Sequence, residues 1–101
     1  MNQQRFALMK RGSYLINTAR GEIVDEKALL TALKKEIICG AALDVFCNEP
    51  RLSVPLRAHP QIFVLPHVGS ATTKARSGMA RLAVNAIIEV LSGRSPTNRI
   101  N

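Results

Sequence analysis

The chain has 101 residues and a mass of 11.0 kDa, which is enough for at most one domain. Hydrophobic residues make up 47% and charged residues 21%, a balance that excludes wholesale disorder, and the apolar runs are too short to cross a membrane. The two cysteines, Cys39 and Cys47, cannot form a disulfide framework or a zinc site, so we expect free thiols, no metal and a cytoplasmic location.

The net charge of +7 raises the possibility of nucleic-acid binding. The fourteen basic residues are scattered from Arg5 to Arg99, however, and the four aromatic side chains offer little for base stacking. We therefore expect a solvated basic surface, suited to small anions, and neither a nucleic-acid nor a membrane partner.

The first half of the chain predicts a strand, a helix and a second strand. Residues 13–19 form an apolar run typical of a buried parallel strand. Asp25 follows as a helix N-cap, with Val24 and Leu29 spaced for a hydrophobic staple around it. Residues 37–46 predict the second strand.

The second half predicts a loop over residues 47–60, a third strand over 61–66, and a long amphipathic helix from about Thr72 to Ser92. Gly93 would end that helix, and the tail from Arg94 onward is expected to be loose. Strand, helix and strand with short connections indicate a right-handed crossover and a parallel sheet of the α/β class.

Chemically useful side chains follow each predicted strand. Arg20 comes after the first, Asp44 and Glu49 after the second, and His67 after the third. Ligands bind outside the carboxyl ends of strands in open parallel sheets, so these residues predict a site at that edge. Each residue taken alone also fits a structural role, as a surface arginine, a loop carboxylate or a capping histidine.

The three candidates suit the reduction of a small acid. A guanidinium matches a carboxylate bidentately, so Arg20 could hold a 2-oxo or 2-hydroxy acid. His67 could exchange a proton with the substrate oxygen, and Glu49 could favour the charged imidazole. No side chain supplies hydride, which points to a nicotinamide cofactor.

At these residues the chain resembles the D-isomer-specific 2-hydroxyacid dehydrogenases, in the glyoxylate, hydroxypyruvate and 2-ketogluconate reductase branch. The resemblance rests on Phe6 to Lys10, Ile16 to Gly21, Ala42 to Phe46 with Glu49-Pro50, and Pro66 to Thr72. It implies that Arg20 binds the substrate carboxylate and carbonyl, His67 is the acid/base, and Glu49 is its carboxylate partner. It further implies that Thr18, Asp44 and Gly69 lie against the nicotinamide half of NAD or NADP, with Ser70 near the substrate.

The resemblance also implies that residues 1–101 are the C-terminal portion of a Rossmann-type doubly wound sheet, about three parallel strands plus a long helix. No glycine falls in a Gly-x-Gly-x-x-Gly turn, so the dinucleotide-binding half and the substrate domain would be absent. One local departure from the family pattern is Glu36, which stands where a helix-ending glycine is common.

Such a fragment is expected to be inactive alone, needing the N-terminal part of the enzyme or associating through its exposed strand edge. A non-catalytic interaction module that keeps the fold is the alternative hypothesis. Nucleic-acid binding is a third, and it predicts salt-sensitive retention on DNA.

Overall fold

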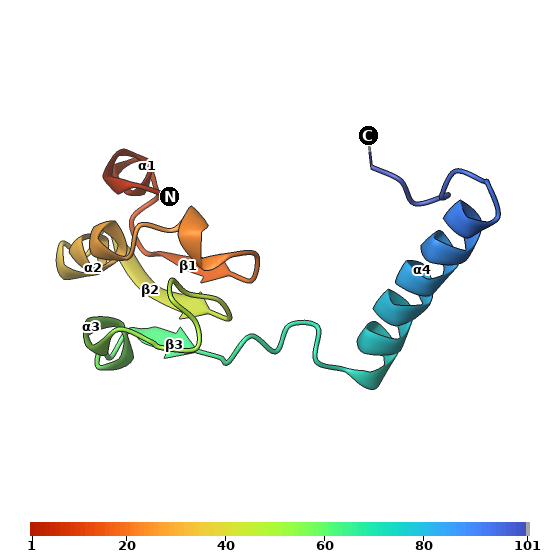
Figure 1. Ribbon diagram of the computed structural model, residues 1–101. Helices are drawn as coiled ribbons and strands as arrows, with labels where there is room; N and C mark the ends of the chain where they lie inside the picture. Colours follow the sequence, from red (N-terminus) through yellow and green to blue (C-terminus); the bar gives the residue numbers. More distant parts are fainter. Residues whose placement is uncertain (101) are drawn as a thin grey trace. The chain divides into compact units, whose positions relative to one another are not determined.

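The computed structural model describes residues 1–100, which belong to two compact units, Met1–Gly69 and Ser70–Asn101. The first unit contains the sheet and the short helices, and the second contains one long helix (Figure 1). Within residues 1–100, no helix combines the length and the apolar character that crossing a membrane requires.

The sheet has three strands in the order β1 (Ser13–Asn17), β2 (Ile38–Leu43) and β3 (Ile62–Val64). Both strand pairs are parallel, which confirms the predicted α/β class. Each strand is shorter than its predicted range of 13–19, 37–46 or 61–66, because the strand pairing stops where loops take over the backbone hydrogen bonds.

Helix α2 (Glu26–Lys34) connects β1 to β2, and its start follows the local sequence signals. The Asp25 carboxylate accepts hydrogen bonds from the backbone N–H groups of Lys27 and Ala28, both at 3.0 Å. Val24 and Leu29 are both buried, as the predicted staple requires. Glu36 follows the helix with a φ of 53°, the left-handed conformation in which a glycine is usual.

Two short helices were not predicted. Helix α1 (Gln3–Ala7) begins at Asn2, whose side chain accepts the Arg5 N–H, and helix α3 (Val54–Arg57) lies inside the predicted loop 47–60. Both are too short to show helical periodicity in the sequence. A 3₁₀ turn, η1 (Gly21–Ile23), follows the loop after β1.

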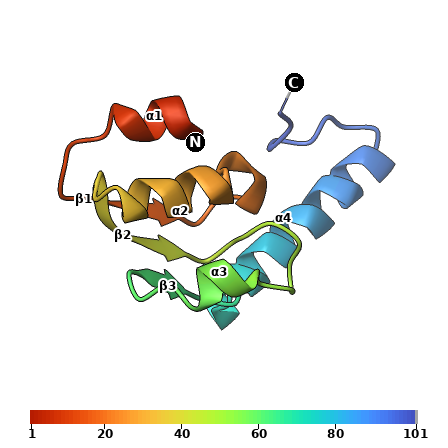
Figure 2. The ribbon, with the colours of Figure 1, turned by 90° about the vertical axis from the view of Figure 1, so that its left-hand side faces the viewer.

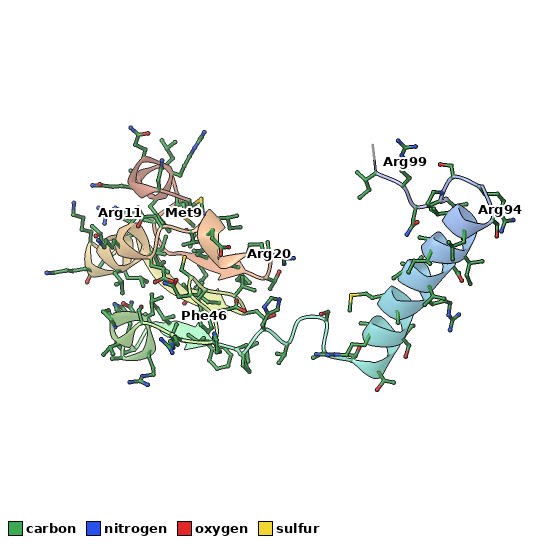
Figure 3. The ribbon with its side chains drawn as sticks, viewed as in Figure 1. Met9, Arg11, Arg20, Phe46, Arg94 and Arg99 are labelled. Atoms are coloured by element: carbon green, nitrogen blue, oxygen red, sulfur yellow. The ribbon has the colours of Figure 1, made fainter. Side chains whose placement is uncertain are left out.

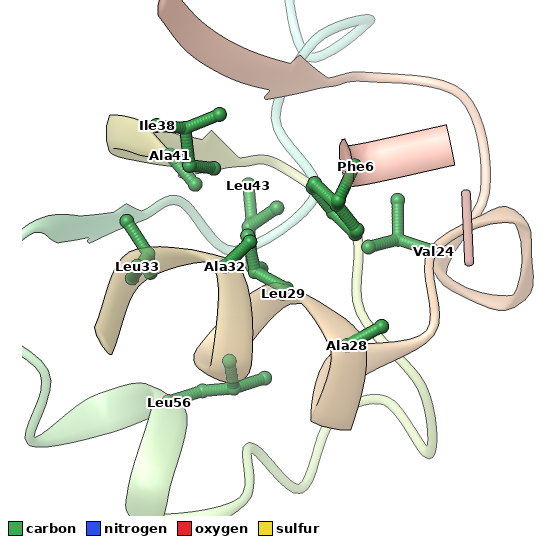
Figure 4. Close-up of a cluster of buried hydrophobic side chains, with 10 residues drawn as sticks. All are labelled: Phe6, Val24, Ala28, Leu29, Ala32, Leu33, Ile38, Ala41, Leu43 and Leu56. Atoms are coloured by element: carbon green, nitrogen blue, oxygen red, sulfur yellow. The ribbon is translucent and has the colours of Figure 1, made fainter. Parts of the chain in front are cut away.

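The core lies between the sheet and the helices of the first unit, as Figure 4 shows. Phe6 from α1, Leu29 and Leu33 from α2, and Leu56 from α3 are almost completely buried in this cluster, together with Ile38 and Leu43 from β2. Figure 2 shows α1, α2 and α3 beside the sheet from a second direction.

The helices of the first unit leave the other face of the sheet exposed. Tyr14, Ile16 and Phe63 are 64–72% exposed there, and the face carries a shallow apolar groove of about 390 Å³. The prediction of a buried first strand is therefore wrong for one side of β1, because the helices of the first unit cover only the other face of the sheet.

The second unit is built around helix α4 (Thr73–Leu91), which matches the predicted range 72–92 closely. The Thr72 hydroxyl accepts the Ala75 N–H, and Gly93 follows the helix end. None of the residues of α4 is buried. The tail beyond it is partly fixed, because Thr97 N–H donates to the Glu89 carboxylate at 3.0 Å, whereas residue 101 lies outside the described residues.

Candidate active site

Backbone hydrogen bonds keep the three chain segments side by side beyond the ends of the strands. The Asp44 N–H donates to the carbonyl oxygen of Asn17, and the His67 N–H donates to the carbonyl oxygen of Asp44, both at 2.9 Å. The segments that follow β1, β2 and β3 therefore lie next to one another at the carboxyl edge, as the parallel topology predicted.

The three catalytic candidates line one hollow of about 330 Å³ at this edge. Its wall consists of Arg20, Gly21, Glu22, Phe46, Asn48, Glu49 and His67. Figure 3 shows Arg20 and Phe46 among the side chains of this unit. A guanidinium, two carboxylates and an imidazole thus face a space large enough for a small organic acid.

The side chains of Glu49 and His67 contact each other directly in this hollow. The Nδ1 atom of His67 lies 2.8 Å from Oε2 of Glu49, and Oε1 of Glu49 accepts the Phe46 N–H at 3.1 Å. The hydrogen bond from His67, followed by that from Phe46, lowers the pKa of Glu49 below its ordinary value. A carboxylate only accepts hydrogen bonds, so Nδ1 carries the proton and Nε2 is the nitrogen left to exchange one.

The loop that carries Arg20 is fixed by Asn17. The Asn17 side chain donates to the Arg20 carbonyl oxygen at 2.8 Å and accepts the Ala19 N–H at 3.1 Å. Asn17 is buried, whereas Arg20 is exposed and donates through Nη1 to the Ala19 carbonyl oxygen at 2.7 Å. Asn17 was not predicted to belong to the site, although an asparagine that ends an apolar strand is a recognisable signal for such a turn.

Asp44 holds the segment that follows His67. Its two carboxylate oxygens accept the Val68 and Gly69 N–H groups, both at 2.7 Å, and its side chain is only 5% exposed. A Cβ atom on Gly69 would lie 2.9 Å from Oδ2 of Asp44, so the lack of a side chain permits this approach. Asp44 therefore positions the segment next to His67, whatever else it binds.

The remaining predicted site residues lie in two places. Thr18 is exposed in the loop between β1 and Arg20, and it makes no hydrogen bond through its hydroxyl in the structure of residues 1–100. Ser70 is the first residue of the second unit. The cofactor and substrate roles of both residues stay predictions.

The structure also identifies Gly21, which the sequence analysis did not single out as part of the site. A Cβ atom there would lie 2.2 Å from the Phe46 carbonyl carbon and 2.5 Å from the Cys47 nitrogen. The loop after Arg20 thus packs directly on the backbone that leads to Glu49. Both cysteines are free, as predicted, and residues 1–100 contain no group of three or more potential metal ligands from His, Cys, Asp and Glu.

Comparisons with known proteins agree with this geometry. Residues 1–69 match the family model described as D-isomer specific 2-hydroxyacid dehydrogenase, NAD binding domain. The chain is 47% identical over 102 residues to a glyoxylate reductase of Thermofilum pendens, covering 100% of this chain and 30% of that protein. It is 46% identical over 99 residues to glyoxylate/hydroxypyruvate reductase B of Escherichia fergusonii, covering 97% of this chain and 31% of that protein.

A solved structure of an NADPH-dependent glyoxylate/hydroxypyruvate reductase from Sinorhizobium meliloti superimposes with a TM-score of 0.82 at 41% identity, covering 90% of this chain and 29% of that one. The chain spans about a third of the length of the relatives it matches. The matching family model, the order of the parallel strands and the residues at their ends lead to one assignment: the chain belongs to the D-isomer specific 2-hydroxyacid dehydrogenase family, within its NAD binding domain.

Proposed function

We propose that this chain serves in the NAD(P)H-dependent reduction of a small 2-oxo acid, such as glyoxylate, hydroxypyruvate or 2-ketogluconate. The observation that carries the proposal is the single hollow lined by Arg20 and by the Glu49–His67 pair. The names of the relatives, glyoxylate reductase and glyoxylate/hydroxypyruvate reductase, support the same substrate class.

In this proposal Arg20 orients the substrate. Its guanidinium is planar and permanently charged, and it has further N–H donors beyond the one that contacts the Ala19 carbonyl oxygen. Two parallel hydrogen bonds to the substrate carboxylate would fix the direction of the adjacent carbonyl group. The positive charge would also draw electron density toward the carbonyl oxygen.

His67 moves the proton. With Nδ1 held by Glu49, the charged imidazole presents Nε2–H to the carbonyl oxygen and transfers that proton as the oxygen becomes a hydroxyl. In the reverse direction, neutral His67 accepts the proton from the 2-hydroxy acid at the same nitrogen. Glu49 keeps the ring oriented through its contact with Nδ1.

The nicotinamide half of NAD or NADP would be held by Thr18, Asp44 and Gly69. The site fits a carboxamide, because each Asp44 oxygen accepts one backbone N–H and retains a second lone pair, and the Thr18 hydroxyl is exposed. When bound, the reduced nicotinamide supplies the hydride that the side chains of this chain cannot. We place Ser70 near the substrate on the strength of the family motif.

We further propose that residues 1–101 act as the second half of a cofactor domain, together with a dinucleotide-binding half and a substrate domain. Two observations support this: no glycine of the chain falls in a Gly-x-Gly-x-x-Gly turn, and the relatives are about three times as long. A polypeptide that combines residues 1–101 with those parts should then reduce glyoxylate or hydroxypyruvate with NADH or NADPH.

The direct test is the oxidation of NADH or NADPH by the native polypeptide that carries these residues, with glyoxylate or hydroxypyruvate as substrate. Arg20→Lys keeps the charge but loses the bidentate geometry, so KM should rise roughly 10- to 100-fold, corresponding to about 1.5–3 kcal/mol. Arg11→Lys is the matched control, since Arg11 precedes β1 and Arg20 follows it. An equal effect of the two substitutions would contradict the assignment of Arg20.

The uncovered apolar sheet face favours one alternative, a non-catalytic module that pairs through this face. Tyr14, Ile16 and Phe63 are its exposed apolar side chains. Light scattering and a cofactor titration, both on the native polypeptide that carries these residues, separate the two functions. A stable dimer of that polypeptide without affinity for NADH or NADPH would support the module and contradict the enzyme.

A further inference from the structure

The segment that carries Glu49 is bonded to helix α2 by a single carboxylate. Oε1 of Glu26, the first residue of α2, accepts the Cys47 N–H at 3.0 Å. Oε2 of the same side chain lies 3.5 Å from the Ser53 hydroxyl oxygen. Glu26 therefore contacts this segment on both sides of Glu49, from 21 and 27 residues earlier in the sequence.

Two carboxylates hold two consecutive backbone amides in this segment. The Phe46 N–H donates to Glu49 and the Cys47 N–H donates to Glu26. Movement of the Cys47 amide would therefore move the neighbouring Phe46 amide, which donates a hydrogen bond to the Glu49 carboxylate. A continuous series of contacts leads from α2 through Glu26 to Glu49 and on to His67.

Helix α2 is a firm support for such a series. Ala28, Leu29, Ala32 and Leu33 are all buried in the core, so the helix cannot shift without disturbing the packing. The Glu26 side chain is half-buried and faces the Cys47 thiol as well as its amide. Burial, followed by the charge of Glu26, raises the pKa of that thiol.

We propose that Glu26 is a positioning residue, which holds the 46–49 turn so that the Glu49 carboxylate meets Nδ1 of His67. This inference rests on the proposed function, in which that pair orients the proton donor. In this arrangement the hydrogen bond from the Cys47 N–H to Glu26 determines the Glu49–His67 contact.

The test uses two substitutions in the native polypeptide. Glu26→Ala removes the acceptor, and we expect kcat to fall by between about tenfold and about a hundredfold, the range expected when a catalytic group is displaced by about 1 Å. Glu26→Gln keeps an oxygen that can accept the Cys47 N–H, so kcat should remain close to that of the unaltered protein. Ser53→Ala removes only the weaker contact and serves as the matched control.

A readout that needs no substrate is the ¹⁵N spectrum of the His67 ring, with His59 as the internal reference. The Nδ1 signal of His67 should change in Glu26→Ala, and it should keep its position in Glu26→Gln and Ser53→Ala. A purely stabilising role for Glu26 would lower Tm and leave both kcat and this signal unchanged, which would overturn the proposal. A loss of kcat in Glu26→Gln as large as in Glu26→Ala would overturn it too.

Failure of the proposed function would have a different signature. If no 2-oxo acid is reduced by any of these proteins while the His67 signal still responds to Glu26→Ala, the positioning role stands and the assigned reaction is wrong. If turnover is found and the signal does not respond, the reaction stands and the positioning role is wrong.

Discussion

Replacing Gly21 by alanine would insert a methyl group between the Arg20 loop and the backbone that leads to Glu49. The new Cβ atom would lie 2.2 Å from the Phe46 carbonyl carbon, 2.4 Å from its oxygen and 2.5 Å from the Cys47 nitrogen. All three are backbone atoms, so no side-chain rotation relieves the overlap and one of the two loops has to move.

Overpacking of a well-packed core typically destabilises a protein by about 1–3 kcal/mol. Because the Gly21 overlap involves backbone on both sides, we expect Gly21→Ala to lower the free energy of unfolding by about 3 kcal/mol. The displaced loops would also separate Arg20 from the Glu49–His67 pair, so KM should rise and kcat should fall together.

Urea unfolding followed by circular dichroism measures the stability change, and NADH or NADPH oxidation measures the activity. Gly78→Ala in α4 is the control, since a Cβ atom there meets nothing within 4 Å and alanine favours a helix by up to about 1 kcal/mol. A Gly21→Ala protein whose unfolding free energy stays within about 0.5 kcal/mol of the original would refute the close contact described here.

Three further outcomes follow from local geometry. Glu36→Gly should raise the free energy of unfolding by about 1 kcal/mol, because Glu36 has a φ of 53°, which glycine adopts without the steric cost of a side chain. Urea unfolding measures this change, and unchanged or lower stability would contradict it. Because the pKa of Glu49 is lowered in the folded protein, its carboxylate stabilises the fold at pH values above its ordinary pKa of 4.5. This contribution is lost as the pH falls through the lowered pKa. The stability difference from Glu49→Gln should therefore shrink in acid, and a difference that is constant with pH would argue against the His67 contact. The raised pKa of Cys47 should make this thiol react with iodoacetamide more slowly than the exposed Cys39 at neutral pH, as mass spectrometry of the labelled peptides would show.

Helix α2 and the three strands could be predicted because their signals are local. Asp25 caps its own helix, and the apolar runs are long enough to mark each strand. The strand ends could not be predicted, because they depend on the partner strand and on loop contacts. Residues 18 and 19 leave the first strand, for example, where the Asn17 side chain takes over the bonding of the next backbone groups.

The convergence of Arg20, Glu49 and His67 could also be inferred from the sequence, since parallel strands bring their carboxyl ends to one edge. The contacts that hold these residues in place could not be predicted. The contacts of Asp44 with Gly69 and of Glu26 with Cys47 join residues 25 and 21 positions apart, and no periodicity or spacing marks them. A glycine in the sequence can indicate that another part of the chain approaches closely, but it does not identify which part.

The backbone of the hollow explains why these supports matter for the proposed chemistry. Asn48 and His67 have φ values of 61° and 55°, a region that asparagine tolerates and that is less favourable for histidine. His67 is kept in this conformation by its own N–H bond to the Asp44 carbonyl oxygen and by the Asp44 carboxylate, which binds the next two N–H groups. The imidazole meets Glu49 from this unfavourable backbone conformation, so the buried Asp44 carboxylate helps to place the ring by binding backbone N–H groups next to it.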